Sequence, residues 1–128
     1  MIIPDSSFWV SLFDESDSYH AQARTIAGTL IPPIWLHEYV LIETATVLAK
    51  RQGKEVTAKF ILALVNNRDV ILFPVSKEVL AHITKRYLTL IDKNPSFVDV
   101  ALIHASEEHE IITFDKDLDK EIKSLKKK

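Results

Sequence analysis

Cysteine is absent from the 128-residue sequence, and glycine and proline are scarce, with two and five copies. The lack of cysteine excludes disulfides and thiolate metal sites. The chain has no low-complexity linker and no internal repeat, and 47% of its residues are hydrophobic and 27% charged, which is ordinary for a globular protein. Because this length fits one compact domain, we expect a single domain over residues 1–128.

Long hydrophobic runs are also missing. No apolar run approaches the roughly 18 residues that a membrane-spanning helix needs. The opening MIIPDSSFWV has neither the basic segment nor the long apolar segment of a secretion signal. We therefore expect a cytoplasmic protein that does not associate with membranes.

The net charge of −2 does not by itself indicate nucleic-acid binding. Basic residues gather in two places, since residues 120–128 hold five lysines and one glutamate, and Lys50, Arg51 and Lys54 form a second group. Both groups are typical of solvated helix ends, where cations complement the helix dipole.

Short apolar runs alternate with stretches that have helical periodicity. Continuous apolar runs of this kind are typical of strands in a parallel sheet covered on both faces. The sequence therefore predicts a three-layer α/β/α sandwich with a central, mainly parallel sheet. We expect strands over Met1–Pro4, Leu30–Trp35, Val70–Phe73 and Ile111–Phe114. We expect helices over Ser7–Phe13, Tyr19–Thr29, Leu36–Arg51, Val56–Val65, Ser76–Ile91, Ser96–Glu108 and Asp117–Leu125, with serines capping the first and Gly53 just beyond the third.

Two aspartates follow predicted strands directly. Asp5 comes after Met-Ile-Ile-Pro, and Asp115 comes after Ile-Ile-Thr-Phe. In open parallel sheets the ligand site lies beyond the carboxyl ends of the strands. Both aspartates are therefore expected to project at one edge of the sheet.

Glu43 lies in the middle of a predicted helix and has no cation to pair with. Its helical neighbours three and four residues away are Tyr39, Val40, Thr46 and Val47. A carboxylate on an apolar stripe needs a partner, a proton or a metal ion, unless the helix turns it to solvent.

Two further acidic positions have an ordinary structural explanation. Ser96-Phe-Val-Asp99 has the form of a capping box. A carboxylate in the first turn of a helix usually also lies at the edge of the sheet where Asp5 and Asp115 are expected, so the two roles are compatible. Any of the three aspartates in Asp115-Lys-Asp117-Leu-Asp119 can cap the last helix. Asp117 or Asp119 suits that role better, because Asp115 follows the strand immediately.

Carboxylates without cysteine or paired histidines suit a hard cation, either Mg²⁺ or Mn²⁺. Such ions position water, lower its pKa and stabilise charge on a phosphodiester oxygen. Mutual repulsion should raise the carboxyl pKa values when no ion is bound. The five histidines have no zinc-site spacing, so we expect them in the core or on the surface.

In order and spacing, the acidic motifs resemble the PIN-domain family, and more narrowly the VapC-type toxins, which are the ribonucleases of toxin–antitoxin pairs. The matching motifs are Ile2-Ile-Pro-Asp5-Ser-Ser7, Tyr39-Val-Leu-Ile-Glu43-Thr-Ala-Thr-Val-Leu48, Ser96-Phe-Val-Asp99-Val-Ala101 and Thr113-Phe-Asp115-Lys-Asp117. The resemblance covers essentially the whole chain and implies a parallel-sheet α/β/α sandwich.

The resemblance also implies roles for particular residues. Metal binding and catalysis fall to Asp5, Glu43, Asp99 and Asp115, and Asp117 can share or replace the fourth position. Ser7 and Thr113 occupy positions where members of the family often have a small polar residue that supports the site. Asp92 occupies a position where some members have an auxiliary acid. The activity implied is Mg²⁺- or Mn²⁺-dependent cleavage of single-stranded or looped RNA. The partners implied are a second copy of the chain and a cognate antitoxin, whose segment covers the acidic cleft.

Two alternatives belong to other classes of function. A catalytically silent PIN module would bind RNA or a partner protein, but such a copy has no reason to keep all four acids. A response-regulator-like phosphoacceptor domain would need a lysine at the end of a late strand, where this chain has Asp115.

Overall fold

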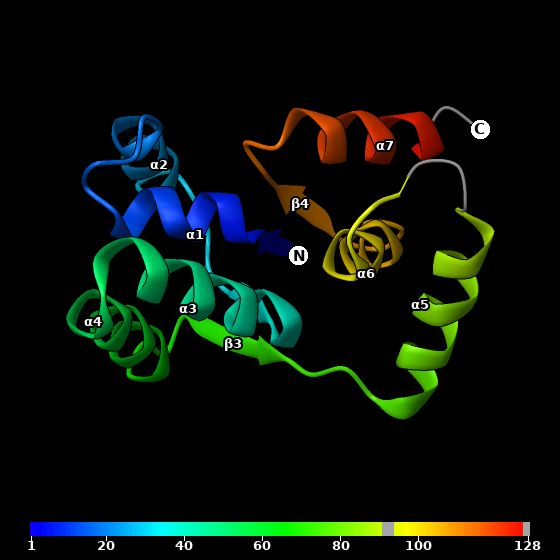
Figure 1. Ribbon diagram of the computed structural model, residues 1–128, viewed down its shortest axis with the longest axis horizontal. Helices are drawn as coiled ribbons and strands as arrows, with labels where there is room; N and C mark the ends of the chain where they lie inside the picture. The colour runs from blue at the N-terminus through cyan, green and yellow to red at the C-terminus, as the bar shows by residue number, and fades with distance from the viewer. Residues whose placement is uncertain (91–93, 127–128) are drawn as a thin grey trace.

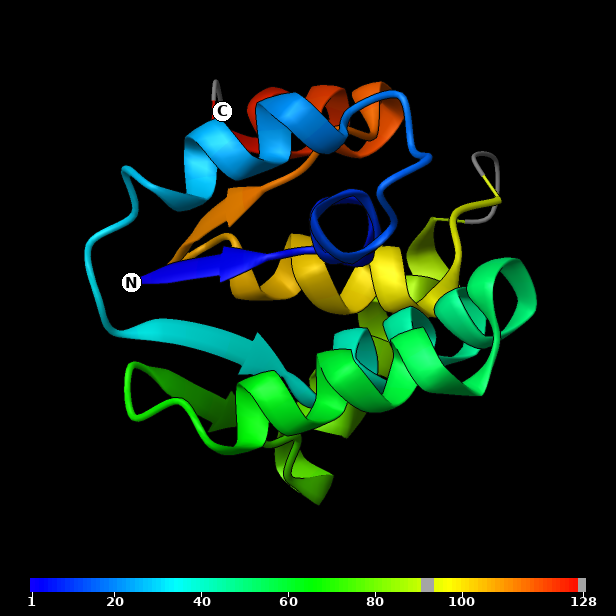
Figure 2. The same ribbon diagram turned by 90° about the vertical axis from the view of Figure 1, so that its left-hand side faces the viewer.

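The computed structural model describes residues 1–90 and 94–126. Its strands form one sheet in the order β3-β2-β1-β4, and every neighbouring pair is parallel. Figure 1 and Figure 2 show helices on both sides of this sheet, which confirms the predicted α/β sandwich. The strands are β1 (Ile2–Pro4), β2 (Ile34–His37), β3 (Val70–Phe73) and β4 (Glu110–Ile112).

Each predicted helix has a counterpart in the structure. The helices are α1 (Ser6–Phe13), α2 (His20–Ala27), α3 (Glu38–Gln52), α4 (Lys54–Val65), α5 (Lys77–Thr89), α6 (Phe97–Ala105) and α7 (Lys116–Lys126). Within the described ranges, no helix has both the length and the apolar character needed to cross a membrane.

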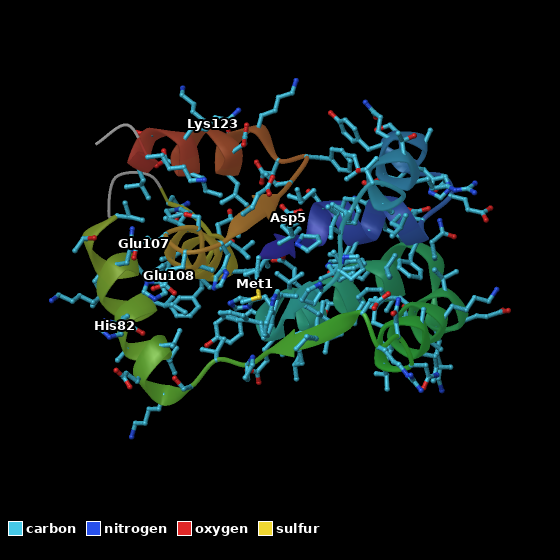
Figure 3. All side chains as sticks on the ribbon, turned by 180° about the vertical axis from the view of Figure 1, so that it is seen from behind. Met1, Asp5, His82, Glu107, Glu108 and Lys123 are labelled. Carbon is cyan, nitrogen blue, oxygen red and sulfur yellow. The ribbon has the colours of Figure 1, made fainter. Side chains whose placement is uncertain are left out.

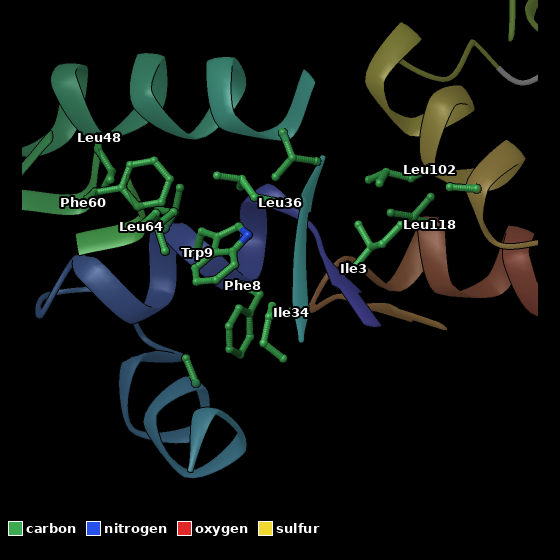
Figure 4. Close-up of a cluster of buried hydrophobic side chains, with 14 of the residues drawn as sticks. Ile3, Phe8, Trp9, Ile34, Leu36, Leu48, Phe60, Leu64, Leu102 and Leu118 are labelled. Carbon is green, nitrogen blue, oxygen red and sulfur yellow. The ribbon is translucent and has the colours of Figure 1, made fainter. Parts of the chain in front are cut away.

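The hydrophobic core has a part on each face of the sheet. Ile3 of β1 turns toward Leu102 of α6 and Leu118 of α7, whereas Ile34 and Leu36 of β2 face the cluster formed with α1, α3 and α4 (Figure 4). This division gives the three layers, with the sheet between two sets of helices. Side chains with no exposed surface include Ile3, Phe8, Val40, Leu48, Phe60, Ile83 and Val100.

Several boundaries differ from the prediction for identifiable reasons. Strand β2 begins at Ile34 rather than at Leu30, because Pro32 and Pro33 have no N–H to donate to a neighbouring strand. Helix α1 begins at Ser6 and is capped by Asp5, not by a serine as predicted, since Asp5 Oδ1 accepts a hydrogen bond from the Phe8 amide at 3.0 Å. The end predicted at Ile91 for the fifth helix lies outside the described residues.

Gly53 joins two helices without a linker. It follows the last residue of α3 and precedes the first residue of α4, and its N–H donates to the Ala49 carbonyl at 3.1 Å. Its φ of 86° lies in the region that glycine adopts without strain. The predicted position of Gly53 just beyond the third helix is therefore confirmed.

His37 at the end of β2 is 1% exposed, and its Nδ1 accepts a hydrogen bond from the Tyr39 amide at 3.1 Å. Burial lowers the pKa of its imidazole from 6.5 to about 4, although the nearby Glu38 charge opposes this shift. Between these pH values the unfolded chain binds a proton that the folded protein does not. Protonation of the unfolded chain should therefore remove on the order of 2–3 kcal/mol of folding free energy as the pH falls from 6.5 to 4.

The variant His37→Asn keeps a capping acceptor and removes this titration, so its unfolding free energy should depend less steeply on pH between 6.5 and 4. Urea unfolding at several pH values measures the slope. His82→Asn, at an exposed histidine of α5, is the control and should keep the parent slope. An unchanged slope in His37→Asn would show that His37 is not the group responsible.

Candidate functional site

Asp5 lies where β1 passes into α1, and its carboxylate is held by neutral donors only. The residue is 4% exposed. Besides the Phe8 amide, Oδ1 accepts from the Ser7 hydroxyl at 2.6 Å, and Oδ2 accepts from the Thr113 hydroxyl. The amide at the start of α1 and the helix dipole favour a negative charge here. Asp5 is therefore fixed in place without a compensating cation.

The end of β4 brings Thr113 and Asp115 to the same place, as the strand-end argument predicts. The Asp5 amide donates to the Ile112 carbonyl at 2.9 Å, which aligns the two chain segments. Thr113 Oγ1 accepts from the Asp115 amide at 2.9 Å while it donates to Asp5. The Ser7 hydroxyl accepts from the Phe114 amide at 2.9 Å. Ser7 and Thr113 thus connect β1 with the segment that enters α7.

Asp115 is the N-cap of α7, which corrects the prediction that Asp117 or Asp119 has this role. Its Oδ1 accepts from the amides of Asp117 at 2.9 Å and Leu118 at 3.2 Å. The reason is that β4 ends at Ile112, two residues earlier than predicted, so a short turn separates Asp115 from the strand. Asp119 instead forms an ion pair with Lys123 at 2.8 Å.

Glu43 of α3 is half-buried, and the Ser6 hydroxyl donates a hydrogen bond to its Oε1. From the sequence alone, Ser6 is predicted only as part of a helix start. Its position directly after Asp5 was the one available signal. Within residues 1–90 and 94–126, Glu43 forms no ion pair, as its helical neighbours predict.

Asp99 lies in the first turn of α6. The predicted cap is present, because the Ser96 hydroxyl accepts from the Asp99 amide at 3.0 Å. Asp99 is half-buried and lines a pocket of about 420 Å³ together with Asp115, Asp117 and Lys120. As expected, Asp99 thus takes part in the helix cap and also lies beside Asp115. The region that holds Asp5, Glu43, Asp99 and Asp115 is called the acidic edge below.

The carboxylates act on one another electrostatically. Burial raises the pKa of Asp99, and the charges of Asp115, Glu43 and Asp5 raise it further, in that order of effect. Burial also raises the pKa of Asp5, and the Asp115 charge adds to it, while hydrogen bonds from Ser7, Thr113 and the Phe8 amide oppose the shift. For Asp5 and Asp99 the predicted direction is correct, but burial raises their pKa values more than repulsion does.

Asp115, rather than Asp117, is the acid of the last motif whose charge acts on both Asp5 and Asp99. Four separate elements therefore bring Asp5, Glu43, Asp99 and Asp115 within electrostatic reach. Asp92, the auxiliary position, lies outside the described residues.

The donor set fits a hard cation in chemistry, since it consists of carboxylate oxygens with hydroxyls behind them. None of the four carboxylates has a basic partner at ion-pair distance in the described part of the chain. In that part, no group of three or more His, Asp and Glu side chains could hold a metal ion as the side chains stand. An ion bound directly by three or more of these carboxylates would therefore require side-chain rotation.

The histidines do not line the pocket that contains Asp99 and Asp115. Four of them line a pocket of about 440 Å³ between the sheet, α5 and α6, namely His37, His82, His104 and His109. Figure 3 shows Asp5 near β4, with His82, Glu107 and Glu108 on the α5–α6 side of the molecule. His20 approaches the Ser11 carbonyl through Nδ1 at 2.8 Å. His37 is a core position and His82 a surface position, as predicted, whereas His20, His104 and His109 are half-buried.

An aromatic stack beside Asp115 was not predicted. The ring of Tyr19, just before α2, lies 4.7 Å from the ring of Phe114 at an interplanar angle of 11°. Their sequence positions are far apart, so no local pattern could have paired them. Together with Arg51 and Asp115 they line a pocket of about 360 Å³.

Comparison with known proteins adds three findings. Residues 2–121 match the family model described as PIN domain. A comparison with curated proteins returned no match. Among solved structures, the chain is similar to VapC20 of Mycobacterium tuberculosis, a sarcin–ricin loop cleaving toxin, with a TM-score of 0.84, 23% identity and 94% of each chain covered. At this level of identity the similarity concerns the fold.

Proposed function

Because the chain belongs to the PIN domain family, we propose that it is a metal-dependent endoribonuclease and the toxin of a type II toxin–antitoxin pair. The observation that supports this function best is the convergence of the four carboxylates, since the charges of Asp115, Glu43 and Asp5 all raise the pKa of the half-buried Asp99. Acids that repel one another and lack basic partners favour binding of a cation.

In this proposal Asp5, Glu43, Asp99 and Asp115 hold Mg²⁺ or Mn²⁺. Asp115 is preferred to Asp117 as the fourth ligand, because its charge acts on both Asp5 and Asp99. When bound, the ion would lower the pKa of a water molecule and stabilise negative charge on the phosphodiester.

The surrounding hydroxyls position the carboxylates without neutralising them. Ser7 and Thr113 each donate to one oxygen of Asp5, and Ser6 donates to Glu43. Outer partners of this kind fix the orientation of ligands and typically change metal affinity 10- to 100-fold when removed. The roles proposed for Ser6, Ser7 and Thr113 are therefore positioning roles.

Glu43→Gln tests the proposal, because it removes one charge and keeps an oxygen that can accept from Ser6. Binding of Mn²⁺, followed by isothermal titration calorimetry, should weaken by about 10-fold or more, and Mn²⁺-supported RNA cleavage should fall with it. Glu55→Gln, at an exposed position in the first turn of α4, should match the parent in both measurements.

Two outcomes would contradict parts of this proposal. RNA that stays intact with the parent protein in Mg²⁺ and in Mn²⁺ would favour the silent binding module over the enzyme. Unchanged Mn²⁺ affinity in Glu43→Gln would remove Glu43 from the ligand set.

The remaining expectations belong to the same proposal: one domain over residues 1–128, action in the cytoplasm, a homodimer, and an antitoxin that covers the acidic edge. Exposed apolar side chains support a protein partner. Leu62 and Val65 of α4 are 59% and 74% exposed, and Leu72 of the edge strand β3 is 50% exposed. Burial of such side chains against a second chain is favourable.

A further inference from the structure

The pocket beside the acidic edge that contains Tyr19, here called the Tyr19 pocket, is lined by Ser6, Ser7, Tyr19, Arg51, Phe114 and Asp115, among others. Its volume is about 360 Å³. Asp115 also lines the pocket that contains Asp99. The two pockets therefore share one of the proposed metal ligands.

Tyr19 presents a fixed aromatic ring in this pocket. The ring of Phe114 stacks with two other rings, Tyr19 at 4.7 Å and 11° and Phe8 at 6.2 Å and 27°. Phe8 has no exposed surface, so the stack is anchored in the core. Among the residues that the structure describes, no ring other than Phe114 stacks on Tyr19. Tyr19 is partly exposed and lines this pocket, and unpaired nucleobases bind proteins by stacking on such rings.

Arg51 lines the same pocket, and its charge is paired with Asp17, which also lines the pocket, and with Asp14. Its Nη1 contacts Asp17 Oδ2 at 2.9 Å and Asp14 Oδ2 at 3.6 Å, and its side chain is 50% exposed. Both contacts use Nη1, and in the described part of the chain no ion pair or hydrogen bond involves Nη2. A guanidinium has five N–H donors, so Arg51 retains donors that fit a phosphate oxygen.

We propose that the Tyr19 pocket binds one unpaired nucleotide of single-stranded RNA, with its base stacked on Tyr19 and a phosphate at Arg51. The nucleotide is next to the one whose phosphate reaches the carboxylates, so this inference rests on the proposed function and deepens it. Its consequence for the substrate is that a nucleotide beside the cleaved bond must lie outside a duplex, because a base inside a duplex is stacked on both faces and cannot present either face to Tyr19.

Binding without cleavage tests this subsite. A fluorescently labelled six-nucleotide RNA is titrated in EDTA, where it stays intact, and anisotropy gives the dissociation constant. Tyr19→Leu should weaken binding by roughly fivefold or more, as expected for loss of one base stack, whereas Tyr19→Phe should bind within about twofold of the parent protein. Tyr87→Leu, at an exposed tyrosine of α5, is the matched control and should bind like the parent.

Arg51 is tested by the salt dependence of the same binding. Arg51→Gln should reduce the slope of log Kd against log salt by about 0.7, as expected for loss of one single-strand phosphate contact. Arg68→Gln, at an exposed arginine between α4 and β3, should keep the parent slope. An unchanged slope in Arg51→Gln overturns the phosphate assignment.

The outcomes separate the subsite from the nuclease. Parent-like affinity in Tyr19→Leu, or equal losses in Tyr19→Phe and Tyr19→Leu, overturns the stacking role even if the parent protein cleaves RNA. A loss confined to Tyr19→Leu supports the subsite even if no cleavage occurs, in which case the proposed nuclease activity fails alone. Circular dichroism and thermal unfolding of each variant identify losses that come from misfolding.

Discussion

Asp5→Asn should reduce metal-supported RNA cleavage by more than about 100-fold and leave the protein folded. The reason for the lost activity is that Asp5 is the most buried of the four proposed ligands and is held by Ser7, Thr113 and the Phe8 amide. Loss of an outer partner of a metal site costs 10- to 100-fold, so loss of a ligand charge should cost more.

The fold should tolerate this change. Asparagine keeps one oxygen that accepts from the Phe8 amide and from Ser7, and its amide can donate to the Thr113 hydroxyl. Burial raises the pKa of Asp5, which means that the ionised carboxylate is destabilised in the folded protein at neutral pH when no ion is bound. In EDTA at pH 7, the variant should therefore melt at the parent temperature or above it.

Thermal unfolding and cleavage of the same RNA measure the two effects. Asp119→Asn is the control, because Asp119 lies on α7 near Asp115 but is paired with Lys123 at 2.8 Å on the surface. It should cleave RNA at close to the parent rate. Cleavage by Asp5→Asn within about 10-fold of the parent would overturn the ligand role of Asp5.

Phe60→Ala should lower the free energy of unfolding by about 3–5 kcal/mol. Phe60 of α4 has no exposed surface. Its ring lies 5.2 Å from Phe13 at 76° and 6.2 Å from Trp9 at 56°, so α4 is packed onto α1 by three aromatic side chains. Truncation to alanine leaves a cavity that neighbouring rings cannot fill without leaving their rotamers.

Urea unfolding gives the free energy for this comparison. Lys59→Ala changes the preceding, exposed residue of α4 and should stay within about 0.5 kcal/mol of the parent. A loss below about 1 kcal/mol in Phe60→Ala would mean that the region collapses to fill the space, contrary to the packing described here.

The sequence predicted the fold well because its strands are short apolar runs between helices, a pattern that depends on local periodicity. Glu43 could be singled out in the same way, since the absence of a cation three or four residues away is a local property. The capping role of Asp115 could not be predicted, because any of three aspartates can cap α7. Which one does so depends on where β4 leaves its pairing with β1. Local sequence does not determine that residue.

The stack of Tyr19 on Phe114 shows a different limit. Each residue by itself looks like an ordinary core aromatic, and their contact depends on how α2 is placed next to the start of α7. The Ser6 hydrogen bond to Glu43 has the same origin, since it joins α1 to α3. Contacts of this kind arise from tertiary packing, which a single sequence does not reveal.

The junction at Gly53 links folding to chemistry. Gly53 is both the C-cap of α3 and the N-cap of α4, so the two helices are joined without a connecting segment that could absorb a shift of one helix relative to the other. Glu43 lies on α3, and the buried Phe60 holds α4 against the core. A substitution that loosens the packing of α4 should therefore also displace α3 and its Glu43. Such a variant would lose RNA cleavage although none of the proposed metal ligands had been changed.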